Sequence, residues 1–280
     1  MQPNDILDFF AKYVEAELGI VFHKENYYQL QQRIDEIVKI LGVSSAEELY
    51  LMGQKGITGN FKQLLLDIAT NNETSFFRDP TAFKAIENLV LPDLFEKTKD
   101  LKKLRIWSAA SSTGQEALSV AMIIHEWMAK NNKRIDFEII GTDISERALN
   151  RAKNASYTQL EVQRGLPMPL LIKYFRKDVN DNWIAKDQIR NETKFQSLNL
   201  KAPYPFKDKF DLILCRNVLI YQSVAGKKEI IEKLCSMLHP AGYFALGSTE
   251  SMIGLSTEFE MKMIGESSIY KKKLPQAVAA

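Results

Sequence analysis

The chain has 280 residues, of which 45% are hydrophobic and 26% are charged, values typical of a globular protein that buries a full core in one large or two modest domains. The 37 lysine and arginine residues nearly balance the 35 acidic residues, so the net charge of +2 gives no reason to expect a nucleic-acid partner. The N-terminus lacks the features of a signal peptide and no apolar run reaches transmembrane length, which predicts a soluble, cytoplasmic protein without direct membrane insertion.

The cysteines and histidines show no metal-binding pattern. Cys215 and Cys235 have no CxxC partner, which predicts a reduced, intracellular protein without a cysteine-built metal site. His23, His125 and His239 are scattered and lack the spacing of metal ligands, so we expect them to be structural or solvated.

Residues 1–95 have the hydrophobic periodicity of helices, so we predict a small all-α N-terminal domain with a linker. A second helix should end at Gly42, and a short third helix near Gly53. Asp79-Pro80 predicts the start of a fifth helix, because it places an acidic N-cap before a proline at the first helical position.

Residues 69–79 separate the fourth and fifth predicted helices and have neither helical nor strand periodicity. The segment is polar, then doubly aromatic at Phe76 and Phe77, then cationic at Arg78. It can bring amide and hydroxyl groups and one guanidinium to a ligand, with two rings packed behind them. The alternative is a capping loop that its phenylalanines anchor in the core.

An apolar run at residues 104–110 is followed by a turn of small residues and then, from Gln115, by the periodicity of an amphipathic helix. Strand, turn and helix in this order open a nucleotide-binding βαβ unit. Only Gly114 is present where a dinucleotide fingerprint has three glycines, and Glu116 would repel a pyrophosphate while suiting a cationic or hydroxyl-rich ligand. An ordinary α/β packing turn is the alternative.

The second strand of the unit, residues 137–142, ends at Asp143. An acid at this position can accept hydrogen bonds from ribose hydroxyls, although it could instead cap the next helix. Residues 156–195 then interrupt the strand–helix alternation, and we predict a small antiparallel β insertion there.

The doubly wound pattern resumes with a buried strand at residues 210–215. It ends in Arg216 and Asn217, which lie where open α/β sheets bind ligands; the alternative is a buried pair satisfied by backbone groups. After the next helix, which residues 239–242 are expected to close, residues 243–246 and 268–272 supply two last strands.

Five motifs together resemble the CheR family, the chemotaxis receptor glutamate methyltransferases that use S-adenosylmethionine. In chain order they are T-N-N-E-T-S-F-F-R, W-S-A-A-S-S-T-G-Q-E, G-T-D-I-S, F-D-L-I-L-C-R-N-V-L-I-Y and H-P-A-G-Y-F-A-L-G-S-T-E. The resemblance spans almost the whole chain and implies an all-α N-terminal domain followed by a doubly wound, Rossmann-like methyltransferase domain from residue 96.

The resemblance also implies a site and a partner. Arg78 and Tyr221 would stand beside the reacting centre. The partner would be the cytoplasmic helical bundle of methyl-accepting chemotaxis receptors, and we expect the enzyme to be a monomer. The cofactor S-adenosylmethionine would be held by Asn72, Thr74, Arg78, Glu116, Asp143, Asn199, Leu200, Arg216 and Asn217.

Two features depart from the family pattern. Where members commonly read S-T-G-E-E-P-Y-S, this chain has S-T-G-Q-E-A-L-S, so the first acid is replaced by Gln115 while Glu116 remains, and we expect cofactor binding to persist. Members that tether to a receptor's C-terminal peptide carry a glycine-containing loop in the insertion, whereas residues 177–183 have no glycine. We therefore do not expect such a tether. Lys24, Arg33 and Lys39 of the N-terminal helices can instead attract a glutamate-rich receptor helix; the alternative is that they are solvated helix charges.

Two other functions compete with methyl transfer. A nicotinamide-dependent oxidoreductase would use a similar fold, but the missing glycines and Glu116 disfavour it. A regulatory or scaffold protein could keep an adenosyl ligand and lack turnover.

Overall fold

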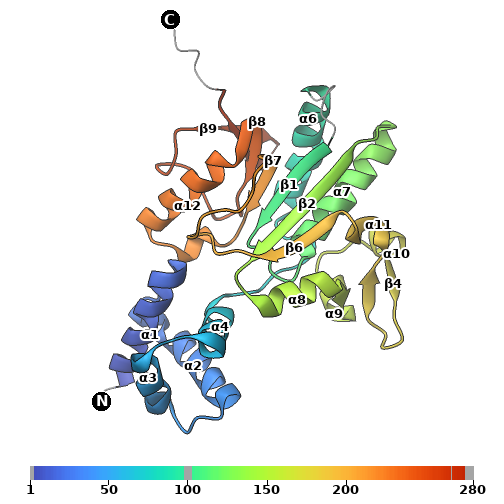
Figure 1. Ribbon diagram of the computed structural model, residues 1–280. Coiled ribbons are helices and arrows are strands. Elements are labelled where there is room, and N and C mark those ends of the chain that lie inside the picture. The colour runs from blue at the N-terminus through green and yellow to red at the C-terminus, as the bar shows by residue number, and fades with distance from the viewer. Residues whose placement is uncertain (1–2, 98–102, 266, 275–280) are drawn as a thin grey trace, which may run out of the picture.

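The computed structural model describes residues 3–97, 103–265 and 267–274. The first four α-helices form a bundle at one end of the molecule (Figure 1): α1 (Pro3–Leu18), α2 (Tyr27–Leu41), α3 (Ala46–Lys55) and α4 (Gly59–Ala69). Their apolar faces share one core, in which Phe10, Ile34 and Leu65 are buried. This confirms the predicted helical N-terminal region.

Two glycines of the bundle have different roles. Gly42 ends α2 in the left-handed conformation, with φ of 68°, as predicted. The third helix was expected to stop near Gly53, and α3 ends two residues later, at Lys55. A Cβ on Gly53 would lie 2.8 Å from Cε1 of Phe9, so this glycine permits close helix packing and does not end the helix.

A seven-stranded sheet with the order β6-β2-β1-β7-β8-β10-β9 forms the centre of the rest of the chain. Neighbouring strands within the run β6-β2-β1-β7-β8 are parallel to each other. Strand β10 is antiparallel to both of its neighbours, β8 and β9. Their bounds are β1 (Lys103–Ala109), β2 (Asp136–Asp143), β6 (Thr193–Ser197), β7 (Phe210–Cys215), β8 (Leu238–Ala245), β9 (Phe259–Ile264) and β10 (Ser267–Lys272).

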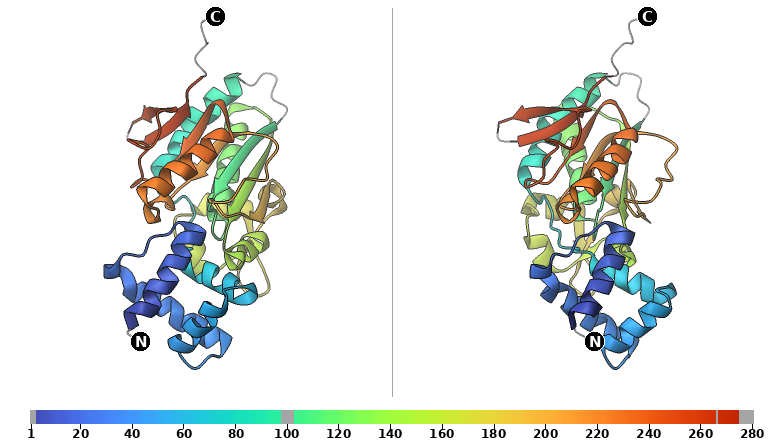
Figure 2. Two further views of the ribbon diagram at one scale, coloured as in Figure 1. Left: turned by 60° about the vertical axis from the view of Figure 1, so that its left-hand side comes forward. Right: turned by 90° about the vertical axis from the view of Figure 1, so that its left-hand side faces the viewer.

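Helices cover both faces of the sheet, as Figure 2 shows, which confirms the predicted doubly wound α/β fold. Ile106 of β1 is buried with α7 (Gln115–Asn131) on one face, and its neighbour Trp107 with α12 (Val224–Ser236) on the other. α8 (Glu146–Asn154) packs against β2, β6 and α4.

The helices after residue 79 belong with the sheet. α5 (Pro80–Ala85), a π-helical turn (Ile86–Val90) and α6 (Leu91–Lys97) bury their side chains in the same cluster as β1 and α7. The predicted boundary at residue 95 therefore does not coincide with the division between the two cores, because the core of the helical bundle ends with Ala69.

The predicted insertion contains a three-stranded antiparallel sheet with the order β3-β5-β4. Its elements are β3 (Ser156–Tyr157), α9 (Gln159–Gln163), α10 (Met168–Tyr174), β4 (Phe175–Lys177), β5 (Trp183–Ala185) and α11 (Asp187–Arg190). Residues 193–195, which the prediction included in the insertion, instead begin β6 at the edge of the main sheet, parallel to β2.

The C-terminal strands also differ from the prediction. Residues 239–242 do not close the preceding helix, because they lie within β8. There is also one strand more than expected, since β9 pairs with β10. In the part of the chain that the structure describes, no helix combines the length and hydrophobicity needed to cross a membrane.

Candidate active site

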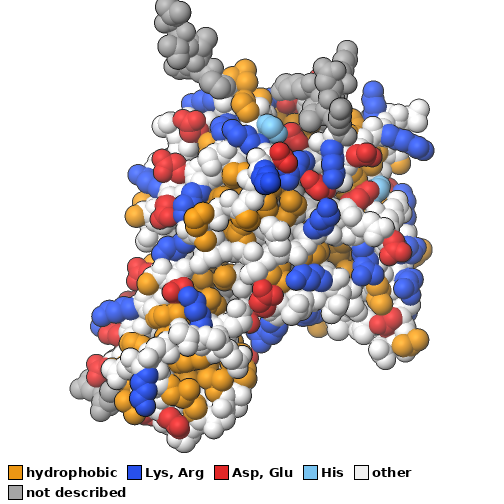
Figure 3. All heavy atoms as spheres, viewed as in Figure 1, with side chains coloured by type: hydrophobic (Ala, Val, Ile, Leu, Met, Phe, Trp, Pro, Cys, Tyr) orange, Lys and Arg blue, Asp and Glu red, His pale blue; other side chains and the backbone are white. Residues whose placement is uncertain are grey.

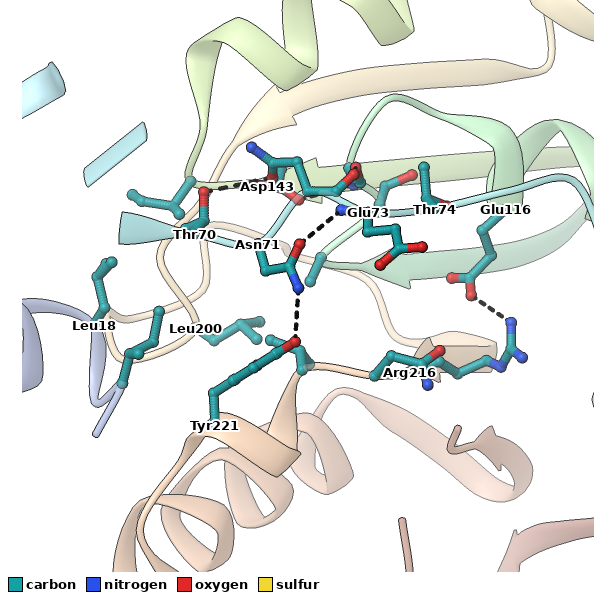
Figure 4. Close-up of a pocket in the computed structure, with 18 of the residues that line it drawn as sticks. Leu18, Thr70, Asn71, Glu73, Thr74, Glu116, Asp143, Leu200, Arg216 and Tyr221 are labelled. Carbon is teal, nitrogen blue, oxygen red and sulfur yellow. Dashed lines mark hydrogen bonds and ion pairs between the residues drawn. The ribbon is translucent and has the colours of Figure 1, made fainter. Parts of the chain in front are cut away.

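A cleft of about 950 Å³, including space open to solvent at its mouth, lies at the carboxyl ends of the central strands. Figure 4 shows side chains from several elements converging on it. The structure brings together there every residue that the family resemblance assigned to the site: Asn72, Thr74, Arg78, Glu116, Asp143, Asn199, Leu200, Arg216, Asn217 and Tyr221.

The turn after β1 forms the floor of the cleft. Ala110, Ser112 and Gly114 have φ values of 65°, 50° and 93°, so the backbone leaves the strand in left-handed conformations. A Cβ on Gly114 would lie 3.0 Å from the Cβ of Ala152 in α8, which explains why only glycine fits there. The hydroxyl of Ser111 is buried in this turn without a hydrogen-bond partner in the described structure.

Asp143 ends β2 directly beside this turn. Its carboxylate accepts hydrogen bonds from the backbone N–H groups of Ser112 at 2.8 Å and Ser145 at 3.0 Å. Burial nevertheless raises the pKa of Asp143 above its ordinary value. The hydroxyl of Ser145 caps α8 by accepting from the N–H of Ala148, so Asp143 is not the helix cap and lines the cleft instead.

An ion-pair network connects the ends of three segments across the cleft. Arg216 lies at the end of β7, and only 2% of its side chain is exposed. Its Nη1 lies 2.9 Å from Oε2 of Glu116, and its Nη2 lies 3.3 Å from Oδ2 of Asp79. The other oxygen of Glu116 accepts from the hydroxyl of Ser108 at 2.7 Å. Nη2 of Arg216 also donates to the carbonyl of Arg78. The predicted alternative of a buried pair is thus partly present: Nη1 and Nη2 of Arg216 bind side chains and a backbone carbonyl, whereas its buried Nε has no hydrogen-bond partner among the described residues.

Residues 70–78, together with the adjoining Asp79, form one wall of the cleft, which we call the first wall. Its two phenylalanines point away from the cleft: Phe76 is fully buried with its ring centroid 5.0 Å from that of Tyr157, and Phe77 packs edge-on against Phe83 at 5.4 Å. The polar residues between 70 and 75, together with Arg78, line the cleft. Both interpretations of this loop therefore hold, because the rings anchor it and its polar groups face the site.

Residues 216–221 form the opposite wall, which we call the second wall. At the mouth of the cleft, Nδ2 of Asn71 donates to the hydroxyl of Tyr221 at 3.0 Å, so the two walls are joined there, as Figure 4 shows.

The N-terminal bundle also borders the cleft, which the sequence did not predict. Leu18 and Ile20, at and just after the end of α1, line the cleft together with Asn199. Nδ2 of Asn199 donates to the carbonyl of Glu17 at 2.8 Å, and the N–H of Val21 donates to the carbonyl of Tyr221 at 2.9 Å. These contacts join segments about 200 residues apart, and no periodicity in the sequence signals them.

Residues 72–267 match the family described as CheR methyltransferase, SAM binding domain. The chain belongs to this family. It is 35% identical to chemotaxis protein methyltransferase Cher2 of Pseudomonas putida over 271 residues, which cover 95% of this chain and 98% of the relative. It is 34% identical to chemotaxis protein methyltransferase 1 of Pseudomonas aeruginosa, with coverage of 96% and 98%, and 32% identical to the chemotaxis protein methyltransferase of Borreliella burgdorferi, with coverage of 90% and 89%.

The chain is therefore a methyltransferase that uses S-adenosylmethionine, and the oxidoreductase alternative is set aside.

The residues of the site fit this cofactor. The buried carboxylate of Asp143 can accept from ribose hydroxyls, and the unpartnered hydroxyl of Ser111 can bond a polar ligand group. Glu116 places a negative charge in the first turn of α7, which suits a cationic ligand and opposes a pyrophosphate.

Proposed function

We propose that the enzyme methylates glutamate side chains on the cytoplasmic helical bundle of chemotaxis receptors and so adjusts receptor signalling in sensory adaptation. The observation that carries the proposal is the convergence of Arg78 and Tyr221 on a cleft that also contains Glu116 and Asp143. The names of the relatives connect them to chemotaxis and to methyl transfer. The enzyme would act in the cytoplasm as a monomer.

The reaction needs little acid or base catalysis. A surface glutamate has an ordinary pKa of about 4.3 and is already an anion at neutral pH. When bound, S-adenosylmethionine supplies an electrophilic methyl group on a sulfonium, which becomes a neutral thioether as the carboxylate oxygen forms the ester bond. The protein must therefore align the carboxylate and exclude water, and positioning accounts for most of the rate.

We assign the residues of the cleft to these tasks. Asp143 would bind the ribose, and Glu116 would balance the positive charge of the cofactor. Asn72, Thr74, Asn199, Leu200, Arg216 and Asn217 would complete the cofactor pocket. Arg78 would hold the substrate carboxylate with its planar guanidinium, and Tyr221 would orient it with its hydroxyl.

The structure changes the role expected of Arg33 in receptor docking. This residue is half-buried, donates to the carbonyl of Ala69 at the end of α4, and lies over the ring of Phe22 at 5.3 Å. Burial lowers its pKa. Arg33 therefore supports the start of the first wall, whereas Lys24 and Lys39 are exposed.

We propose that Lys24 and Lys39 guide an acidic receptor helix to the cleft, because the N-terminal bundle borders its mouth. On the face shown in Figure 3, basic and acidic side chains are interspersed, so such attraction must come from individual residues. Lys24→Glu combined with Lys39→Glu should slow receptor methylation and leave cofactor affinity unchanged, and added salt should slow the wild type.

Lys130→Glu combined with Lys133→Glu is the matched control. These exposed lysines lie at and after the end of α7, the end farther from the N-terminal bundle in Figure 1. Equal rates for both double variants would contradict docking through the bundle.

A C-terminal receptor tether is not expected. The turn between β4 and β5 is closed by Asp178, whose carboxylate accepts from the N–H groups of Asn180 and Asn182 at 2.8 Å each. Because residues 177–183 lack the glycine found in members that tether, deleting a receptor's C-terminal peptide should change the rate little, and a large loss on that deletion would assign recognition to the insertion.

The decisive experiment supplies tritiated S-adenosylmethionine and the organism's membranes to the purified protein. Base-labile tritium on receptor bands, released as methanol, is the expected result. Cofactor binding without ester formation would instead select the alternative, an adenosyl-ligand-binding regulatory or scaffold protein without turnover.

A further inference from the structure

A single carboxylate outside the cleft lining accepts several backbone hydrogen bonds from the second wall. Glu250 accepts backbone hydrogen bonds from Asn217 at 2.7 Å, Val218 at 3.1 Å and Ile220 at 3.2 Å. It also accepts from the N–H of Gly247 at 2.9 Å, while its own N–H donates to the carbonyl of Gly247 at 3.0 Å. Residues 247–250 thus form a turn that is closed by two hydrogen bonds between Gly247 and Glu250, one through the backbone and one through the Glu250 side chain.

The conformation of the second wall depends on such an anion. Asn217 has φ of 59°, a left-handed conformation that is uncommon for a residue other than glycine. In this conformation successive N–H groups can converge on one point and form a concave site for a negative charge. The carboxylate of Glu250 occupies that site, and without it these N–H groups would lose their partner.

The packing around the carboxylate is close. A Cβ on Gly247 would lie 2.7 Å from Nδ2 of Asn217 and 2.9 Å from Oε2 of Glu250, so any larger residue there would displace these two side chains. The same turn also reaches the first wall, because the N–H of Ser248 donates to Oδ2 of Asp79 at 3.2 Å. The turn at residues 247–250 therefore supports both walls.

We propose that Glu250 is a positioning residue for methyl transfer. By fixing the backbone from Asn217 to Ile220, it holds the next residue, Tyr221, with its hydroxyl opposite Asn71 at the mouth of the cleft. This inference rests on the proposed function of Tyr221, and it assigns Glu250 no contact with substrate or cofactor.

The first test measures the wall without using turnover. In Glu250→Gln the side chain keeps its size but presents an NH₂ group to backbone donors. We expect the amides of Asn217, Val218 and Ile220 to exchange hydrogen much faster, while amides in α12 keep their protection. Glu258→Gln is the control, because Glu258 is an exposed carboxylate eight residues further along the chain. Unchanged exchange in a folded Glu250→Gln protein would overturn the inference.

The second test asks whether Glu250 acts through Tyr221. At saturating cofactor, Glu250→Gln should lower kcat on the order of 10- to 100-fold, the effect of a displacement of about 1 Å at a reacting centre. In a Tyr221→Phe background the same substitution should cost no more than roughly two- to threefold, because the group that it positions is already gone. An equal loss in both backgrounds would overturn the inference.

Glu250→Asp keeps the carboxylate on a shorter side chain, and it should recover part of both the protection and kcat. Recovery would exclude misfolding as the cause of the losses in Glu250→Gln.

The proposed function and the proposed role of Glu250 fail in different ways. Full activity of Tyr221→Phe would remove the proposed role of Tyr221, and with it the action of Glu250 through that hydroxyl. Absence of receptor methyl esters with the wild type would refute the proposed substrate, whereas hydrogen exchange would still decide whether Glu250 holds the wall.

Discussion

The two walls of the cleft are held by different forces. The first wall is anchored by two aromatic rings, Phe76 in the core beside Tyr157 and Phe77 against Phe83. The second wall is anchored by the carboxylate of Glu250, through directional hydrogen bonds to its backbone. Apolar burial is non-directional and carries no charge, so it tolerates changes in pH and small shifts of position. A carboxylate clamp fixes position more closely, but it depends on one group.

This contrast predicts that damage to the first wall appears mainly as lost stability, whereas damage to the second appears mainly as lost rate. The walls meet at the hydrogen bond between Asn71 and Tyr221 and at the network of Asp79 and Arg216. Substitutions at the anchors and at these junctions can therefore separate the two effects.

The largest effect is expected for Phe76→Ala. Phe76 is fully buried and also lies edge-on to Phe175 at 5.6 Å, so its removal leaves a cavity between the first wall and the insertion. The free energy of unfolding should fall by about 3–5 kcal/mol in denaturant titrations. Phe77→Ala, at a half-buried ring, should cost clearly less. Equal losses for the two variants would show that the anchor is not the core ring.

The next largest effect is expected at Asp143, which lies beside the turn that forms the floor of the cleft. Asp143→Ala removes the carboxylate that we assign to the ribose, which should weaken binding of S-adenosylmethionine by about 1.5–3 kcal/mol in calorimetry. Asp143→Asn keeps the size of the side chain and one acceptor oxygen, and it should lose less. Unchanged affinity in Asp143→Ala would assign the ribose to another residue.

The sequence predicted those parts of the site that follow from strand order. Gly114, Asp143 and Arg216 lie at or just after the carboxyl ends of strands with apolar cores, and in a parallel sheet these ends meet at one edge. The prediction that the loop at residues 69–79 belongs to the cofactor site came from the family resemblance. Its composition alone fitted both a ligand-facing loop and an anchor, and the structure shows both functions in one segment.

The errors have physical causes. β9 was missed because Met261 and Met263 are exposed beside charged residues, so the strand lacks a buried alternating face. The start of β8 contains Pro240 and Gly242, which favour a turn, but the strand tolerates them next to a register shift. The clamp of Glu250 joins residues 30 to 33 positions apart through backbone donors, and side-chain patterns carry no signal of such a contact.

A smaller effect, on rate alone, is expected for Arg78→Lys. The substitution keeps the charge but loses the planar fork that can hold a carboxylate with two hydrogen bonds. Methyl transfer should fall on the order of tenfold, as for one lost charge-assisted hydrogen bond of about 1.5 kcal/mol, while the free energy of unfolding should change by less than about 0.5 kcal/mol. Arg164→Lys is the control, because Arg164 is an exposed arginine that pairs with Glu73 of the same wall. Wild-type turnover in a folded Arg78→Lys protein would leave the first wall with only a supporting role.

The smallest effect is a pH dependence at the junction of the walls. Burial opposes the charge of Asp79, but the N–H of Ser248 and the guanidinium of Arg216 outweigh it and hold the pKa of Asp79 below its ordinary value. A depressed pKa contributes stability that is present above the unfolded value of about 3.9 and is lost as pH falls through the folded value. The advantage of the wild type over Asp79→Asn in free energy of unfolding should therefore be constant from about pH 5 to pH 8 and shrink below about pH 4. Asp143 has a raised pKa and the opposite sign, so Asp143→Asn should lose any stability advantage over the wild type as acid protonates the buried carboxyl. If the advantage of the wild type over Asp79→Asn instead grew in acid, Asp79 would not be held as an anion between Ser248 and Arg216.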